Sequence, residues 1–233
     1  MAEPVPPSHM AYDRTIVVFS PEGRLLQVEY ARQMVKNGIT SIGIRLSDGV
    51  LLGTVKIAPQ LAVLDSYKKI YQIDEHIAAV ISGSLADGKE LAEIARVKAQ
   101  VNRITFGEKI SILSLVSHIC DRKHMVTQYA GVRPYGVGML IGGVDDVGPR
   151  LFETDPSGTM MEWYAQAIGR GGEKARKILI KGYKKDMSKE EGIKLLINAL
   201  KEGEKGTGGE YEVVYVTKSG VERIEEKMIS KYA

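Results

Sequence analysis

Apolar positions in this chain follow two periods: alternation over short segments, and a spacing of three or four over longer ones. Alternation with β-branched residues, flanked by Gly, Asp or Pro, predicts strands. The predicted strand regions are a hairpin over residues 40–57, a second hairpin over 69–82, a block over 135–168 broken at 145–149 and 155–158, and a hairpin over 210–224. Short turns between neighbouring segments are typical of antiparallel sheets.

Five other segments repeat their apolar residues at the helical spacing. The predicted helices are residues 24–36, 87–103, 110–123, 173–183 and 188–202. In the first of them Arg32 interrupts a narrow apolar stripe, and Asn37-Gly38 supplies a stop signal. A helix with such a stripe must pack against another part of the protein.

The order of these elements is strands, helix pair, strands, helix pair, strands. This order predicts two stacked antiparallel sheets with helices on both outer faces, an α+β four-layer αββα sandwich. A chain of 233 residues lies within the range in which one layered domain keeps a single core. We therefore expect one domain.

Composition and charge are those of an ordinary folded protein. Apolar residues make up 44% and charged residues 26% of the chain, and the net charge of +3 combines 32 basic with 29 acidic side chains. So small and interspersed a charge differs from the basic stripe of nucleic-acid binders. No apolar run approaches the roughly 20 residues of a membrane helix. We expect neither nucleic acid nor a membrane as a partner.

The first residues differ from the rest of the chain. Pro4, Pro6 and Pro7 fix φ and remove backbone donors, which predicts an extended and mobile segment before Tyr12. The segment also lacks the basic and apolar regions of a secretory signal. The single cysteine, Cys120, has no disulfide partner within the chain. These features predict a soluble cytoplasmic protein.

A long motif follows this segment. The chain reads Tyr12-Asp13-Arg14 and then Ser20-Pro21-Glu22-Gly23-Arg24-Leu25-Leu26-Gln27-Val28-Glu29-Tyr30-Ala31. The pattern closely resembles the N-terminal signature of archaeal-type proteasome α subunits. The resemblance implies the sandwich fold of N-terminal nucleophile hydrolases. It also implies a non-catalytic subunit of the outer ring of the core particle, which controls access of substrate to proteolytic β subunits.

The resemblance gives the N-terminus the role of a gate. It implies that Tyr12, Asp13 and Arg14 belong to the gate, with Pro21 in a turn that moves on activation and Tyr30 on the helix behind it. A tyrosine hydroxyl and an aspartate carboxylate can form directional hydrogen bonds between neighbouring subunits. We therefore expect residues 1–14 to be a mobile gate segment and residues 15–233 to be one proteasome α-type domain.

A second implied site receives the C-terminal carboxylate of regulatory ATPases or other activators. Lys69 matches the lysine that binds this carboxylate, and Gly38 matches a glycine that lines the pocket. A cation suits that role. Without the resemblance, Lys69 is instead expected to be a solvated strand-end lysine like Lys68. Ser84 stands where the family usually has an apolar pocket residue, so weaker binding of an activator tail is expected.

A third motif, Thr-Gln-Tyr-Ala-Gly-Val-Arg-Pro-Tyr-Gly, spans residues 127–136 and differs from the family's loop at one position. In the family this loop lines the annulus through which unfolded substrate passes. The residues implied to line it are Tyr129, Ala130, Gly131, Val132, Arg133, Pro134 and Tyr135. The loop is also expected to be a rigid helix-to-strand connector, because Pro134 fixes the start of the next strand.

The sequence argues against catalysis by this chain. Catalytic relatives expose a threonine by cleavage after a glycine, and its free amine serves as base for its hydroxyl. Here Ile39 follows Gly38, and Thr40 comes one residue too late. An ungapped alignment puts Val55 where those relatives have a carboxylate and Asp65 where they have a lysine. We expect no catalytic residue, with a processed threonine hydrolase and a self-assembling ring without a protease partner as alternatives.

No cofactor and no metal are expected. His118, Cys120 and His124 are ligand types, but a helix turning about 100° per residue directs only Cys120 and His124 to one face. The glycines at 169–172 lack the spacing of a phosphate loop and predict a strand-to-helix turn.

The resemblance also implies the partners. They are further copies of the chain in a heptameric α ring, proteasome β subunits, the C-termini of regulatory ATPases or other activators, and unfolded protein in transit. The helix at 24–36 is expected to lie across the site where a catalytic relative has its substrate cleft. We therefore expect a subunit that blocks and assembles rather than cleaves.

Overall fold

The computed structural model describes residues 16–57, 59–63 and 66–232, and the predicted gate segment lies outside them. Strands in this part of the chain form two five-stranded antiparallel sheets. The first sheet, in the order β10-β9-β2-β1-β8, consists of β1 Ser41–Arg45, β2 Gly49–Lys56, β8 Ala165–Ile168, β9 Glu210–Thr217 and β10 Gly220–Arg223. The second, in the order β3-β4-β5-β6-β7, consists of β3 Ile70–Asp74, β4 Ile77–Gly83, β5 Val137–Asp145, β6 Gly148–Thr154 and β7 Met160–Glu162.

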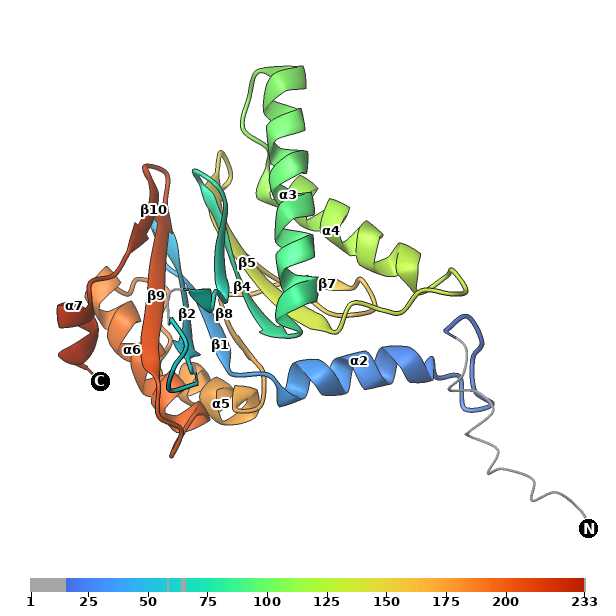
Figure 1. The fold of residues 1–233 in the computed structure, drawn as a ribbon. Coiled ribbons are helices and arrows are strands. Elements are labelled where there is room, and N and C mark those ends of the chain that lie inside the picture. Colours follow the sequence, from blue (N-terminus) through green and yellow to red (C-terminus); the bar gives the residue numbers. More distant parts are fainter. Residues whose placement is uncertain (1–15, 58, 64–65, 233) are drawn as a thin grey trace, which may run out of the picture.

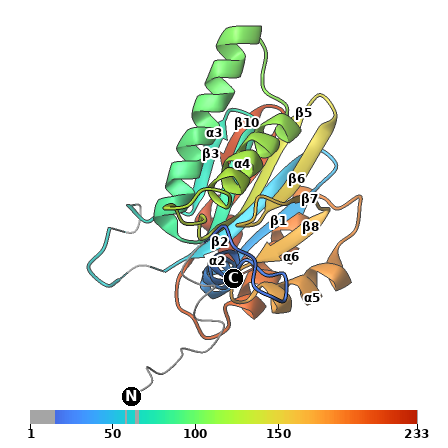
Figure 2. The same ribbon diagram turned by 90° about the vertical axis from the view of Figure 1, so that its right-hand side faces the viewer.

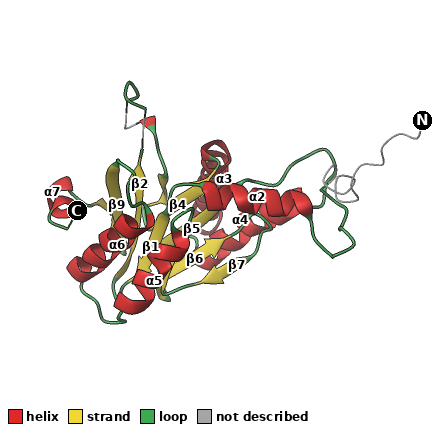
Figure 3. Cartoon of the chain, turned by 90° about the horizontal axis from the view of Figure 1, so that it is seen from below, coloured by secondary structure: helices red, strands yellow, loops and turns green. Residues whose placement is uncertain are grey.

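Helices cover the outer face of each sheet, as Figures 1 and 3 show. α3, Leu85–Phe106, and α4, Ile112–Val126, pack on the second sheet. α5, Gly172–Gly182, and α6, Lys189–Gly203, pack on the first. The predicted four-layer αββα sandwich is confirmed.

Strand β2 shows why the strands of both sheets are apolar along most of their sequence. All its residues are buried, because successive side chains point to opposite faces and both faces are covered. Leu51 and Val55 face the layer of α5 and α6. Val50 and Leu52 face the second sheet and meet Val80 and its neighbours there. The core therefore lies in three layers, one between the sheets and one beneath each helix pair.

The helix α2, Leu26–Asn37, lies across one end of the sandwich and projects from it (Figure 1). It contacts β4 and β5, and its buried residues are Val28 and Ala31. A Cβ atom at Gly138 would lie 2.8 Å from the Cγ1 of Val35, so the helix packs directly on the strand backbone. The helix begins two residues later than predicted because Ser20 to Arg24 form a turn, closed by the Gly23 amide donating to the Ser20 carbonyl at 2.8 Å.

The other predicted elements are found, with shifted ends. α3 extends beyond the predicted residues 87–103, because Ser84 caps its N-terminus and Gly107, at φ 72°, ends it in the left-handed conformation. Figure 2 shows that this long helix extends past the sheet it covers. A short helix, α7, Glu226–Ser230, was not predicted. None of the helices described here is long and apolar enough to cross a membrane.

Candidate functional site

The position of the missing nucleophile lies where β1 begins. Ile39 is half-buried and packs against the core beneath α5 and α6. Thr40 is fully buried, and its amide and hydroxyl donate to Oε1 of Glu204 at 2.8 and 2.6 Å. The hydroxyl also accepts from the amide of Gly171 at 3.0 Å. Thr40 is thus a structural strand-end residue, because its amide and its hydroxyl are both engaged in hydrogen bonds with Glu204 and Gly171.

Glu204, the acceptor for Thr40, is held from a second side. It is 5% exposed and pairs with Arg170, whose Nε donates to Oε2 at 2.9 Å. Burial opposes ionisation of this carboxyl, but the hydrogen bonds from Arg170 and Thr40 leave its pKa below the ordinary value. The pair ties the end of α6 to the turn before α5 and fixes the strand end between them.

Lys69 lies beside the same strand end. It is 2% exposed, and its Nζ donates to the carbonyl of Ile39 at 3.0 Å and to Oγ1 of Thr54 at 2.9 Å. Burial lowers the pKa of this ammonium to about 7, and the charge of Glu204 opposes that shift. It is therefore not the solvated lysine that the sequence pattern alone suggested.

The ungapped alignment put Asp65 at the lysine position, and Asp65 lies outside the described residues. In the structure the Nζ of Lys69 reaches the carbonyl of Ile39, the residue that follows Gly38. Val55, which the alignment puts where catalytic relatives have a carboxylate, is an apolar residue of the core and is 2% exposed.

The three residues predicted to form an activator pocket lie at one junction. A Cβ atom at Gly38 would lie 2.4 Å from the amide nitrogen of Gly83, so only glycine allows the end of α2 to pack on the end of β4. Ser84 follows directly and accepts from the amide of Asp87 at 3.3 Å, as the cap of α3. Lys69 reaches the carbonyl of Ile39, next to Gly38.

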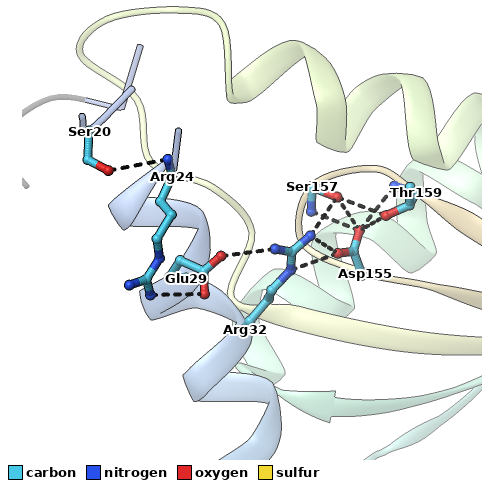
Figure 4. Close-up of polar contacts among 7 residues, drawn as sticks. All are labelled: Ser20, Arg24, Glu29, Arg32, Asp155, Ser157 and Thr159. Carbon is cyan, nitrogen blue, oxygen red and sulfur yellow. Dashed lines mark hydrogen bonds and ion pairs between the residues drawn. The ribbon is translucent and has the colours of Figure 1, made fainter. Parts of the chain in front are cut away.

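An ion-pair cluster anchors α2 to the body of the protein, as Figure 4 shows. The Nε and Nη2 atoms of Arg32 donate to Oδ2 of Asp155 at 3.0 and 2.8 Å. Asp155 also accepts from the amides of Ser157 and Thr159, both at 3.0 Å, within the turn between β6 and β7. The arginine that interrupts the apolar stripe of α2 is therefore its attachment point. The sequence held one signal for it: an arginine where an apolar residue was expected.

The predicted gate residues are only partly described. Tyr12, Asp13 and Arg14 lie outside the described residues. Pro21 is exposed in the turn before α2, and Tyr30 is 52% exposed on that helix. The far end of α2 is thus open to a neighbouring molecule.

The loop at residues 127–136, named here the annulus loop, connects α4 to β5. Its middle is exposed, with Tyr129 at 61% and Val132 at 47%, whereas Pro134 and Tyr135 are buried. Ala130 is exposed, and Gly131 has φ 87°, a value that favours glycine. Arg133 pairs with Asp87 at 2.7 Å, so one end of the loop is fixed to α3.

Other candidate sites from the sequence are accounted for by packing. Cys120 is buried, which raises its pKa to about 11, and His124 contacts Gln128 at 2.8 Å. Gly169 has φ 99° at the strand-to-helix turn, as predicted. A Cβ atom at Gly171 would lie 2.1 Å from the carbonyl oxygen of Gly203, so glycine is required where the start of α5 meets the end of α6.

Comparisons with known proteins give a consistent result. A model of the proteasome subunit family matches residues 35–216, and a model of the N-terminal signature of A-type proteasome subunits matches residues 12–33. A proteasome alpha subunit of Methanopyrus kandleri is 47% identical over 230 residues, covering 97% of this chain and 94% of the relative. The proteasome alpha subunit of Methanocaldococcus jannaschii is 52% identical over 197 residues, covering 84% and 75%. That of Pyrococcus horikoshii is 49% identical over 213 residues, covering 91% and 82%.

Proposed function

Because this chain belongs to the proteasome subunit family, as an archaeal-type α subunit of the non-catalytic outer ring of the 20S core particle, we propose that identical copies close into a heptameric ring that stacks on proteasome β subunits. The observation that carries the non-catalytic role is the strand end at Ile39 and Thr40. Ile39, directly after Gly38, has no hydroxyl, and the hydroxyl of Thr40 donates to the buried Glu204. The proteolysis would be performed by the β subunits, in the cytoplasm.

Native mass measurement tests this proposal most directly. The purified chain should form a ring alone and a larger particle when a β-type subunit is co-expressed. Peptide hydrolysis should appear only in the mixed particle. A mature chain that begins at Thr40 and hydrolyses peptides alone would overturn the assignment, and a ring that never binds a β-type subunit would support a scaffold without a protease partner.

The far end of α3 supports a contact with β subunits. Its last turns carry exposed apolar side chains: Val97 at 62%, Val101 at 50%, Ile104 at 84% and Phe106 at 69%. This end lies away from α2, on the opposite side of the sandwich (Figure 1), where a second ring would stack if α2 faces the entrance. Ile104→Glu should therefore prevent the mixed particle and leave the α ring intact.

The gate is the second part of the proposal. We assign residues 1–14 to it, with Tyr12, Asp13 and Arg14 forming contacts between neighbouring subunits. The anchored base of α2 and its exposed far end at Pro21 and Tyr30 support this role, since a gate needs a fixed support and a free end.

Deletion of residues 1–13 tests the gate in the assembled particle. Hydrolysis of a short peptide should rise, because the tails no longer close the entrance. A particle that lacks only residues 2–6 retains the Tyr-Asp-Arg motif and serves as the matched control. Equal hydrolysis rates for the full-length particle and the particle that lacks residues 1–13 would contradict a closing role for the tails.

The pocket for an activator's carboxylate is the third part. Gly38, Lys69 and Ser84 gather at the junction of α2, β4 and α3, which supports one shared site. Lys69 would supply the cation, and the polar Ser84 would offer less apolar contact to a C-terminal tail. The occupants we propose are the C-termini of regulatory ATPases or of other activators.

The annulus loop is the fourth part. The exposed residues Tyr129 to Val132 would line the passage for unfolded protein. Support comes from the loop's construction, because its exposed middle lies between fixed ends at Thr127 and Arg133. Such a loop offers small and aromatic surface to an extended chain.

A further inference from the structure

The first turns of α3 hold the annulus loop by two acidic residues. Asp87 accepts from both terminal nitrogens of Arg133 at 2.7 Å. Its Oδ2 also accepts from the amide of Gly136 at 2.8 Å. Glu90, one turn later, accepts from the hydroxyl of Tyr135 at 2.9 Å. Because residues three apart lie on one face of a helix, the two carboxylates form a clamp along the loop.

The two members of the Asp87–Arg133 ion pair differ in burial. Asp87 is 5% exposed, whereas 65% of the Arg133 side chain is open to solvent. Burial opposes ionisation of Asp87, but the hydrogen bonds from Arg133 and Gly136 lower its pKa below the ordinary value. The carboxylate is therefore part of the fixed body, and the guanidinium is the movable member that it restrains.

A second helix supports the same loop end. The Nε of Arg122, on α4, donates to the hydroxyl of Tyr135 at 3.2 Å, so this hydroxyl joins α4 to Glu90 on α3. Tyr135 is 7% exposed. The loop end is thus fixed from two helices, while Tyr129 and Val132 remain exposed in its middle.

We infer that Asp87 is a positioning residue for the annulus loop: it holds the Arg133 guanidinium against the body of the protein and so sets the width and charge of the passage. This inference rests on the annulus role proposed above. Without Asp87, the arginine would be free to extend with the exposed part of the loop. Each subunit of a ring would then add one unpaired cation to the passage, which would retain acidic unfolded chains and leave short neutral peptides unaffected.

Hydrogen exchange of the isolated chain tests the positioning directly. Asp87→Ala should speed exchange of the Gly136 amide and of the peptide over 128–136 at least tenfold, because the acceptor and the ion pair are both lost. Glu93→Gln is the matched control: it lies on the same helix and pairs with Arg96 on the exposed side. Exchange in Asp87→Ala equal to that of the control would overturn the inference.

Degradation by the assembled particle tests the effect on the passage, with residues 1–13 deleted to remove the gate from the comparison. The readout is the rate for an acidic unfolded protein divided by the rate for a neutral tetrapeptide. Asp87→Ala should lower this ratio at least threefold relative to Arg133→Gln, which removes the cation itself. The double variant should match Arg133→Gln, because Asp87 acts through the arginine.

A loss that persists in the double variant would overturn the inference, because Asp87 would then act through the stability of α3 alone. Arg133→Gln changes a largely exposed side chain, so the Arg133→Gln protein should fold even if the Asp87→Ala protein is too unstable to assemble. If no particle forms with a β-type subunit, the proposed function fails. The exchange measurement would still decide whether Asp87 positions the loop.

Discussion

Lys69 and Lys123 are the two most deeply buried lysines among the described residues, and they differ in what their amines contact. Lys123 is fully buried on α4, and its Nζ donates to the carbonyl of Val137 at 2.9 Å and to Oγ1 of Thr154 at 2.8 Å. Lys69 is buried nearly as deeply, but its Nζ reaches the strand end at Ile39. The first joins a helix to two central strands of its sheet. The second lies next to the junction that we propose as a binding pocket.

The comparison teaches that position, rather than residue type or burial, decides what a buried lysine can do. Burial lowers the pKa of Lys123 to about 8 and that of Lys69 to about 7. Lys123 donates to β5 and β6, two strands of the sheet that α4 covers. Lys69 donates to the carbonyl of Ile39, next to Gly38, where the end of α2 packs on the end of β4. Only the second amine borders the junction that we propose as a pocket.

The largest effect we expect is a gain in stability as the pH rises from 7 to 9, below the range in which the raised pKa of Cys120 opposes it. Unfolded lysine keeps its proton up to about pH 10.5, whereas the folded chain releases those of Lys69 and Lys123 at about 7 and 8. Stability rises with pH wherever the unfolded state binds more protons, tenfold per unit in the folding equilibrium for one proton. From pH 7 to 9 this corresponds to about 2 kcal/mol for Lys69 and about 1 kcal/mol for Lys123.

Chemical denaturation at a series of pH values checks this prediction and distinguishes the two lysines. Between pH 7 and 8 Lys69 contributes most of the slope, so Lys69→Met should remove most of it there. Lys123→Met should flatten the slope mainly near and above pH 8. Equal slopes in the three proteins would show that neither lysine is neutral in the folded state.

The second effect concerns the strand end beside Lys69. Thr40→Val removes a hydroxyl that donates to the buried Glu204 and accepts from Gly171, and should lower the free energy of unfolding by about 1–3 kcal/mol. The control is Thr207→Val, at an exposed threonine that accepts a hydrogen bond from Arg170. This variant should change the free energy of unfolding by less than about 0.5 kcal/mol.

The same variant also tests whether Thr40 performs chemistry. Peptide hydrolysis by the mixed particle should be unchanged in Thr40→Val, because the hydroxyl has only structural contacts. A loss of hydrolysis with the particle still assembled would show that the site beside Lys69 is catalytic.

The third effect tests Lys69 as the cation of the activator pocket. Lys69→Met should weaken stimulation of peptide hydrolysis by an activator's C-terminal peptide at least tenfold, because the carboxylate loses its counter-charge. Lys123→Met should leave the response unchanged, and Lys68→Met is the matched control at the neighbouring position. An undiminished response in Lys69→Met would remove this lysine from the pocket.

The smallest effect is a pH dependence of the same response. A carboxylate binds the ammonium form of Lys69, which the free chain loses above a pH of about 7. Binding of the activator peptide should therefore weaken about threefold as the pH rises from 6.5 to 7.5. The dependence should persist in Lys123→Met.

Local patterns predicted most of the elements but not all their ends. The hairpins followed from alternation around turns such as Ser47-Asp48-Gly49, and the long helices from their apolar spacing. The ends of α3 depended on the cap at Ser84 and the left-handed Gly107. The short α7 was missed because its few residues carry too little periodic signal, although Ile229 is buried.

The candidate site was predicted where adjacent residues form a motif. The N-terminal signature is a continuous segment, so the sequence alone identified it. The annulus loop is also continuous, and its role stays a prediction. The attachment of α2 was not predicted, because Arg32 and Asp155 are far apart in the chain and meet only in the fold. The clamp between Asp87 and Arg133 was missed for the same reason.

By itself the sequence determined the layered fold, the absent nucleophile and the family, since each depends on neighbouring residues and their spacing. Without the family resemblance, it could not distinguish the environment of Lys69 from that of Lys68, because adjacent lysines before a strand look alike until the second sheet stacks on the first. Tertiary structure alone decided that Lys69 is buried against Ile39 while Lys68 keeps part of its side chain in solvent. The physical reason is that burial and charge pairing arise between distant segments, and no local pattern encodes them.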